Sequence, residues 1–139
     1  MTITKLGERY SVSPQLTLKD LELAAKDGIE LIINNRPDAE SEDQPLSSDL
    51  AEKALELGVQ YVENAFDFKT LSQQHIDAQS QLLNLNKKTL SFCRTGTRSS
   101  VLWILSGVKS GGNYSSLRKH VELSGFDLTR CEAAMEQFI

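Results

Sequence analysis

Long apolar runs are missing from this sequence of 139 residues. No stretch of about 18 apolar residues occurs, so the sequence predicts no membrane span. Positive charge is not in excess either, because 15 lysines and arginines stand against 19 aspartates and glutamates, for a net charge of −4. This balance argues against a broad basic surface for nucleic acid. Residues Met1 to Lys5 lack the apolar core of a signal peptide, so we expect a cytoplasmic protein.

Cysteine is also scarce, with only Cys93 and Cys131 present. In a cytoplasmic chain, two thiols are more often free than bridged. Cys131 falls on the apolar side of the last expected helix, which favours core packing over a role as a second reactive thiol. No pair of histidines or carboxylates has the spacing of metal ligands, so we expect no metal and no other cofactor.

Alternating strand and helix patterns predict a single domain over residues 1–139. Runs rich in β-branched and apolar residues predict strands at 8–12, 29–34, 59–62 and 89–92. Apolar stripes predict helices at about 18–27, 47–57, 71–83, 100–109, 115–123 and 129–138. Capping residues mark three of the helix starts: Thr17, Thr70 with Gln73, and Thr129 with Glu132. This order predicts an α/β fold with a central, mostly parallel sheet of four or five strands, flanked by helices on both faces.

The segment from Leu90 to Ser99 carries the strongest chemical signal. A β-type run ends in Cys93, and a buried helix is expected from about Ser100. A short loop lies between them: Arg94, Thr95, Gly96, Thr97 and Arg98. A strand–loop–helix turn points backbone N–H groups and a helix N-terminus at one spot, which favours the thiolate form of a cysteine there. We therefore expect a loop that can bind phosphate or sulfate, with a nucleophilic sulfur at its base.

The residue types within this loop predict separate roles. Gly96 permits the unusual backbone angles that a ring of N–H groups requires, and the two threonines contribute mainly backbone N–H groups. Arg98 can form a two-pronged fork to a tetrahedral oxyanion. Arg94 can face the substrate or point into solvent. The Ser99 hydroxyl can donate a hydrogen bond to the thiolate.

Other polar residues follow other expected strands. Arg36, Asp38 and Asp67 do so, and sites in parallel sheets form at the carboxyl ends of the strands. These residues can therefore meet Cys93 at one edge. Asp67, which lies between two phenylalanines, is our candidate for the general acid that protonates a leaving oxygen. Arg36 and Asp38 are candidates for the rim of the pocket.

Three motifs together resemble the bacterial beta-lactamase-hydrolase-like family, specifically its phosphatase-like domain. They are Ser13-Pro14-Gln15-Leu16, Asn35-Arg36-Pro37-Asp38 and Cys93-Arg94-Thr95-Gly96-Thr97-Arg98-Ser99. The family is similar to protein-tyrosine and dual-specificity phosphatases. The resemblance implies their α/β fold, here with extra C-terminal helices. It also implies that Cys93 is the nucleophile, that Arg98 binds the oxyanion, and that Asp67 is by position the acid.

The loop departs from the phosphatase pattern in one respect. Four residues separate Cys93 from Arg98, one fewer than in the usual phosphatase loop. This spacing is similar to single-domain rhodaneses, and the smaller cradle suits a sulfane sulfur. Three hypotheses therefore stay open. The first is a hydrolase of phosphate monoesters with a thiophosphoryl-cysteine intermediate, the second is a sulfurtransferase or persulfide carrier with a sulfur donor, and the third is a non-catalytic oxyanion-binding module.

Overall fold

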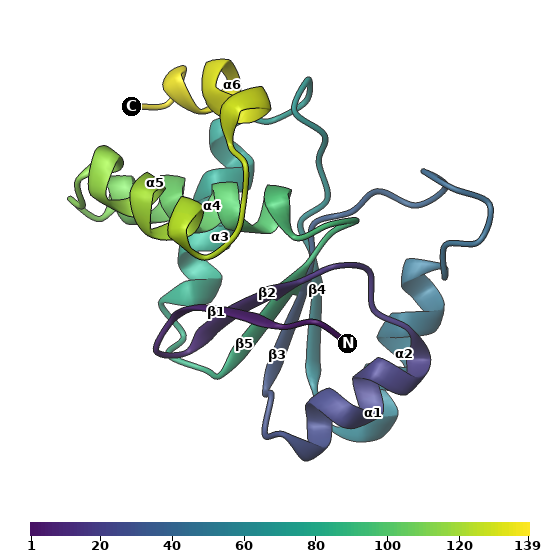
Figure 1. Cartoon of the computed structure of the whole chain (residues 1–139). Helices are drawn as coiled ribbons and strands as arrows, with labels where there is room; N and C mark the ends of the chain where they lie inside the picture. The colour runs from purple at the N-terminus through teal and green to yellow at the C-terminus, as the bar shows by residue number, and fades with distance from the viewer.

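A five-stranded sheet forms the centre of the computed structural model, which describes residues 1–139 (Figure 1). Its strands lie in the order β1–β2–β5–β3–β4. They span Thr4–Gly7 (β1), Tyr10–Ser13 (β2), Leu31–Asn34 (β3), Gln60–Glu63 (β4) and Thr89–Phe92 (β5). The four strands β2 to β5 are parallel to their neighbours, and β1 pairs antiparallel with β2. The predicted mostly parallel α/β sheet is thus confirmed.

The inner strands β3 and β5, which were predicted from the sequence, are more buried than the edge strand β1. All four residues of β3 and all four of β5 are buried, because helices cover both faces of these inner strands. The edge strand β1 was not expected. It has four residues, of which only Leu6 is buried, so it has almost no apolar pattern to detect.

Helices form a layer on each face of the sheet (Figure 1). Helices α1 (Leu18–Lys26) and α2 (Ser47–Leu57) cover one face, and apolar residues such as Leu21 and Leu50 pack there against Ile32 and Phe92. The other face carries α3 (Gln73–Leu83), α4 (Thr97–Lys109), α5 (Tyr114–Leu123), the short 3₁₀ helix η1 (Thr129–Cys131) and α6 (Glu132–Glu136). None of the helices is both long enough and apolar enough to cross a membrane.

Two predicted helix starts are wrong. Helix α3 is capped by Ser72, whose hydroxyl and backbone N–H both bond within a capping box with His75. Thr70 lies three residues before the start of α3 and hydrogen-bonds to Asp67 instead. Helix α4 begins at Thr97 and not at about Ser100, because Gly96 takes a left-handed conformation (φ +94°) and serves as its N-cap. The earlier start puts Arg98 in the first turn of α4.

The expected helix over 129–138 is shorter and irregular. Residues 129–131 form η1, and α6 ends at Glu136. No capping bond joins Thr129 and Glu132, because Asp127 accepts the backbone N–H of Thr129 at 3.0 Å instead. The segment from Gly125 to Cys131 packs beside the start of α4, where the ring of Phe126 lies close to Gly96.

Candidate active site

Cys93 lies at the carboxyl end of the central strand β5 and is only 1% exposed. Its Sγ accepts the backbone N–H of Gly96 at 3.1 Å, which closes the loop around the sulfur. The loop is tied to the β2–α1 connection, because the backbone N–H of Cys93 donates to Ser13 and that of Gln15 donates to the carbonyl of Arg94. The sulfur therefore sits in a fixed position at the sheet edge where parallel strands end.

Several backbone donors around the sulfur have no partner within the chain. Apart from that of Gly96, the N–H groups of the loop and of the first turn of α4 form no hydrogen bond: Arg94, Thr95, Thr97, Arg98 and Ser99. The first N–H groups of a helix have no intrahelical acceptor and carry partial positive charge. The loop can thus supply several backbone donors to one anion.

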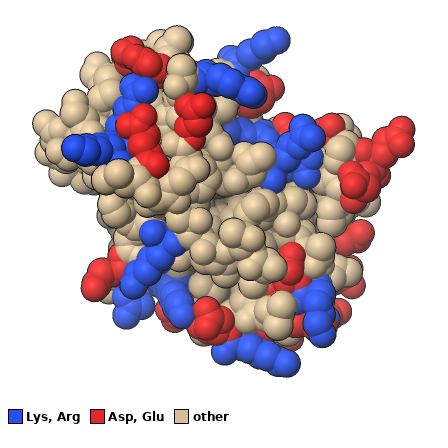
Figure 2. Space-filling model, viewed as in Figure 1, with Lys and Arg blue, Asp and Glu red and all other residues tan.

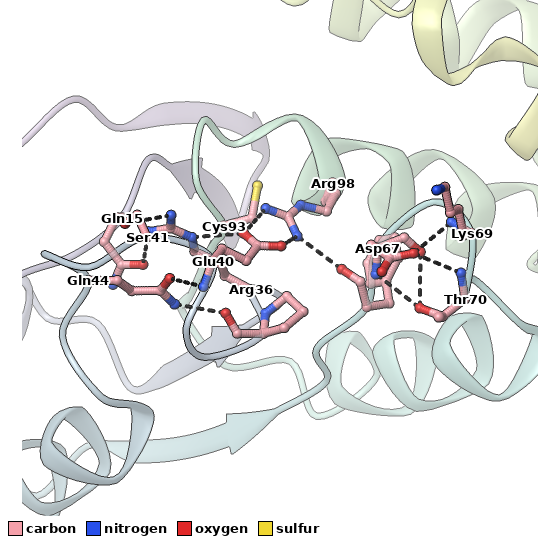
Figure 3. A network of polar contacts seen from close by, with 12 residues as sticks. Gln15, Arg36, Glu40, Ser41, Gln44, Asp67, Lys69, Thr70, Cys93 and Arg98 are labelled. Carbon is pink, nitrogen blue, oxygen red and sulfur yellow. Dashed lines mark hydrogen bonds and ion pairs between the residues drawn. The ribbon is translucent and has the colours of Figure 1, made fainter.

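Arg98 reaches back from α4 to the loop after β3. Its Nη1 and Nη2 atoms each donate to one carboxylate oxygen of Glu40, both at 2.8 Å, and Nη1 also donates to the carbonyl of Phe66 at 3.1 Å. Its guanidinium also lies beside the Cys93 sulfur (Figure 3). Burial lowers the pKa of Arg98, but the hydrogen bonds to the Glu40 carboxylate and its charge contribute to a net rise.

The donors that Arg98 has left form one edge of the guanidinium. Arginine has five N–H donors, and three are used by Glu40 and Phe66. The N–H on Nε and one N–H on Nη2 remain, and they lie on the same side edge of the group. Glu40 therefore holds Arg98 end-on and leaves a two-pronged fork for a further ligand.

Glu40 was not among the residues that the sequence pointed to. It lies in the acidic segment after β3, which the sequence predicts to be a surface loop, and nothing distinguishes it there from Glu42 or Asp43. Its carboxylate is held from two sides, by Arg98 and by Arg36 Nε at 2.9 Å (Figure 3). The hydrogen bond from Arg98, and then that from Arg36, lower the pKa of Glu40 against the opposing effect of burial. Glu40 is therefore ionised at neutral pH.

The two candidates for the pocket rim lie elsewhere. Arg36 is 4% exposed and sits behind Glu40, where its Nη1 also donates to Gln15 at 3.0 Å. Asp38 accepts the backbone N–H of Ser47 at 2.9 Å and so caps the start of α2. Neither side chain lines the cleft. Arg36 supports the site through Glu40, and Asp38 has a structural role.

The Ser99 hydroxyl does not reach Cys93, contrary to expectation, and belongs to a buried polar network beneath the loop. Asn35 Oδ1 accepts the hydroxyls of Ser99 at 2.8 Å and of Ser91 at 2.5 Å. Asn35 Nδ2 donates to Gln79 at 3.1 Å, and Gln79 donates to Ser91 and to Tyr10, whose hydroxyl donates to the Ser99 carbonyl. All five residues are at most 3% exposed. The network joins three strands and α3 to the first turn of α4.

Asp67 lines the cleft but is exposed, so the phenylalanines on either side of it do not bury its carboxylate. Its Oδ1 accepts the backbone N–H groups of Lys69 at 2.8 Å and Thr70 at 3.0 Å, as Figure 3 shows. Its second oxygen has no partner. The preceding carbonyl, of Phe66, is the one that Arg98 holds. Two further side chains of this region that can carry a proton, His75 and Asp77, do not line the cleft.

An open cleft of about 1050 Å³ lies in front of the loop. Thr95, Thr97, Arg94 and Arg98 form one side, with the two threonine hydroxyls 3.0 Å apart. The opposite wall was not predicted from the sequence and comes from the C-terminal segment: Gly125, Phe126, Asp127, Arg130 and Cys131.

Figure 2 shows lysine and arginine side chains gathered between the C-terminal helices and the loop after β3. No group of three or more histidine, cysteine, aspartate or glutamate side chains is arranged to hold a metal ion.

The fold is similar to that of solved protein-tyrosine-phosphatase-like structures. The structure of Tk-PTP matches it with a TM-score of 0.79 over 99% of this chain and 93% of that chain, at 14% identity. Residues 2–110 match the family model described as beta-lactamase hydrolase-like protein, phosphatase-like domain, and the chain belongs to this family. The predicted family and fold are confirmed, and the domain is phosphatase-like.

Two relatives extend over the whole chain. A beta-lactamase hydrolase-like protein of Xylella fastidiosa (strain 9a5c) is 30% identical over 142 residues, which is 99% of this chain and 32% of that protein. The chain thus spans about a third of the length of the curated relatives it matches. The crystal structure of a proposed phosphatase from Neisseria meningitidis has a TM-score of 0.86 and 30% identity, and it covers 100% of this chain and 99% of that chain.

Proposed function

We propose that this chain is a cysteine-dependent phosphatase that hydrolyses phosphate monoesters. One observation carries the proposal: the Cys93 sulfur, the unoccupied side edge of Arg98 and a set of unpaired loop N–H groups lie together beside one cleft. Phosphoryl transfer to a protein side chain requires a nucleophile with hydrogen-bond donors close to it. The phosphatase-like family supports the same assignment.

The reaction would proceed in two steps. The Cys93 thiolate attacks phosphorus, a P–S bond forms, and the P–O bond to the leaving group breaks while Asp67 protonates the leaving oxygen. Water then attacks phosphorus and gives its proton to the Asp67 carboxylate. The P–S bond breaks, which releases inorganic phosphate and returns the thiolate. In both steps the fork of Arg98 and the loop N–H groups stabilise the charge on the phosphoryl oxygens.

Ligands of fold relatives agree with an anion at this loop. TpbA of P. aeruginosa, with a TM-score of 0.68 and 8% identity, has been crystallised with pTyr. A PP-IP phosphatase of S. cerevisiae, with a TM-score of 0.73 and 10% identity, has been crystallised with citrate. By analogy, we expect a phosphate ester or another oxyanion as the ligand of this chain.

The short loop favours a second candidate, sulfur transfer. With four residues between Cys93 and Arg98, the cradle is smaller than in the usual phosphatase loop. In this reaction the Cys93 thiolate would take the sulfane sulfur of a donor such as thiosulfate, forming a persulfide and releasing sulfite. Cyanide would then remove the outer sulfur as thiocyanate and restore the thiolate. This cycle makes no use of Asp67.

The two candidates are separated by one set of assays. Hydrolysis of p-nitrophenyl phosphate is measured over about pH 5 to 8 with the natural chain and with Cys93→Ser, and Cys131→Ser serves as the matched control. Thiosulfate-to-cyanide transfer is measured on the same proteins. Phosphate release that needs Cys93 supports the phosphatase, and thiocyanate release without phosphate release replaces it with the sulfurtransferase. Calorimetric binding of phosphate without either reaction would leave a binding module.

A further inference from the structure

Two arginines in the cleft differ from all the others in the chain. The sequence has six arginines, and four of them form ion pairs with acidic side chains: Arg9, Arg36, Arg98 and Arg118. Arg94 and Arg130 form none, and both line the cleft in front of the Cys93 loop. The two unpaired guanidinium groups of this acidic chain thus face the same space.

The two arginines come from different elements, and each is held in place by its backbone. Arg94 follows Cys93 directly, and its carbonyl accepts the N–H of Gln15. Arg130 lies in η1, beyond residue 110, where the family match ends. Leu128, two residues before it, and Cys131, directly after it, are 0% and 2% exposed and pack into the core, which fixes this wall of the cleft.

The acidic groups of the cleft have other partners. Glu40 is neutralised between Arg98 and Arg36. Asp67 accepts backbone N–H groups of its own turn. Glu132, the acidic side chain closest in sequence to Arg130, pairs with Arg118, and Asp127 accepts the N–H of Thr129. No carboxylate of the chain is therefore bonded to Arg94 or Arg130.

Aromatic side chains border the space between the donors. Phe126 packs against the loop so closely that a Cβ built on Gly96 would lie 3.2 Å from its ring. Phe68 lines the cleft together with Phe126. These rings offer apolar contact to the carbon frame of a ligand that carries anionic groups at its ends.

We propose that the substrates of this site carry a second anionic group, a phosphate or a carboxylate, in addition to the ester that is cleaved. Arg94 and Arg130 bind the second group, while the Cys93 loop and Arg98 bind the ester. Guanidinium groups pair well with both kinds of oxyanion. The inference rests on the proposed phosphatase function, because it names the substrate class of that same site.

The test compares four small substrates: phenyl phosphate, 4-carbamoylphenyl phosphate, 4-carboxyphenyl phosphate and 1,4-phenylene bisphosphate. The last two carry the second anion, and the carbamoyl compound matches the carboxylate in shape without its charge. kcat/KM is measured for the natural chain, Arg130→Gln and Arg94→Gln, with Lys119→Gln as an exposed-cation control outside the cleft. The ratio of natural to variant kcat/KM for each substrate cancels differences in leaving group. Thermal melts check that each variant is folded.

We expect Arg130→Gln and Arg94→Gln to lower kcat/KM about five- to tenfold more for the two substrates with a second anionic group than for phenyl phosphate or the carbamoyl compound. Comparing the loss of kcat/KM for 4-carboxyphenyl phosphate with that for 1,4-phenylene bisphosphate shows whether the second anionic group is preferably a carboxylate or a phosphate. Equal losses on all four substrates would overturn the second subsite and leave the phosphatase intact.

A binding measurement separates this inference from the proposed function. Phenyl phosphate and 1,4-phenylene bisphosphate are titrated calorimetrically into Cys93→Ser and into Cys93→Ser with Arg130→Gln. One outcome would support the subsite and refute the phosphatase function. In it, the natural chain hydrolyses none of the substrates, yet Cys93→Ser binds 1,4-phenylene bisphosphate more tightly than phenyl phosphate, and this difference disappears when Arg130→Gln is added. If neither compound binds, both fail.

Discussion

Glu40 and Arg98 form a two-pronged ion pair in which each carboxylate oxygen accepts one terminal N–H of the guanidinium at 2.8 Å. The pair joins the loop after β3 to the first turn of α4. It occupies only the end of the guanidinium, which lies beside the sulfur of Cys93, and leaves the side edge without a hydrogen-bond partner (Figure 3). Glu40 is thus a positioning residue for the proposed oxyanion ligand, and its removal should affect catalysis more than folding.

Glu40→Gln should lower kcat/KM for p-nitrophenyl phosphate about tenfold, because an amide cannot accept both terminal N–H groups and the orientation of Arg98 is lost. Glu42→Gln, on an exposed residue of the same loop, is the matched control. Steady-state kinetics measure both. Unchanged kcat/KM in Glu40→Gln would mean that Arg98 keeps its orientation without the ion pair.

The same pair should make stability depend on pH. The folded-state pKa of Glu40 lies below its ordinary value of 4.5. Its contribution is therefore fully present above pH 4.5 and is lost as the pH falls through the lower, folded-state pKa. Urea unfolding between about pH 2 and 6 should show a smaller loss of stability on acidification in Glu40→Gln than in the natural chain. Parallel pH profiles for the two proteins would refute the prediction.

Gly96→Ala should reduce both stability and phosphatase activity. The residue has φ +94°, and the new Cβ would lie 3.2 Å from Phe126 and displace either the loop or the C-terminal wall. Gly58→Ala is the control, since Gly58 also has a positive φ but has no atom near the added Cβ. Each should lose about 1–2 kcal/mol from backbone strain, and only Gly96→Ala should lose activity. Full activity in Gly96→Ala would show that the loop tolerates the shift.

Asn35→Ala should destabilise the fold by about 2–4 kcal/mol, because it leaves buried partners of four hydrogen bonds unsatisfied. Gln81→Ala, which truncates an exposed amide on α3, controls for the loss of an amide side chain. Urea denaturation gives both values. A cost below about 0.5 kcal/mol for Asn35→Ala, typical of a surface change, would mean that water replaces the network.

Cys131 should be the slower of the two thiols to react. Burial raises the pKa of the Cys131 thiol against the opposing positive charge of Arg130, so the thiol is protonated at neutral pH. Iodoacetamide should therefore alkylate Cys131→Ser, which retains Cys93, faster than Cys93→Ser, which retains Cys131. Mass spectrometry of the labelled proteins gives the rates. Equal rates would contradict the assignment of Cys93 as the activated thiol.

Local sequence signals predicted the parts of the molecule that depend on near neighbours. The strand over Thr89–Phe92 was predicted with its bounds, because four consecutive buried residues between polar turns leave little ambiguity. Thr17 was predicted as the N-cap of α1, and the structure adds a capping box with Asp20, whose bonds join residues three apart. Thr70 and Thr129 were also predicted as helix caps, but their backbone N–H groups donate to Asp67 and Asp127 instead. A pattern of residue types does not show which of two nearby acceptors a backbone N–H group will bond to.

The sequence by itself determined the family, the α/β order of elements and the Cys93–Arg98 loop, because each can be recognised from residues that are close together along the chain. Only the tertiary structure decided which distant side chains surround that loop. Glu40 contacts Arg98 across 58 positions, Ser99 turns to Asn35 across 64, and Arg130 reaches the cleft from the C-terminal wall. These contacts depend on how the helices pack on the sheet, so no local sequence pattern predicts them.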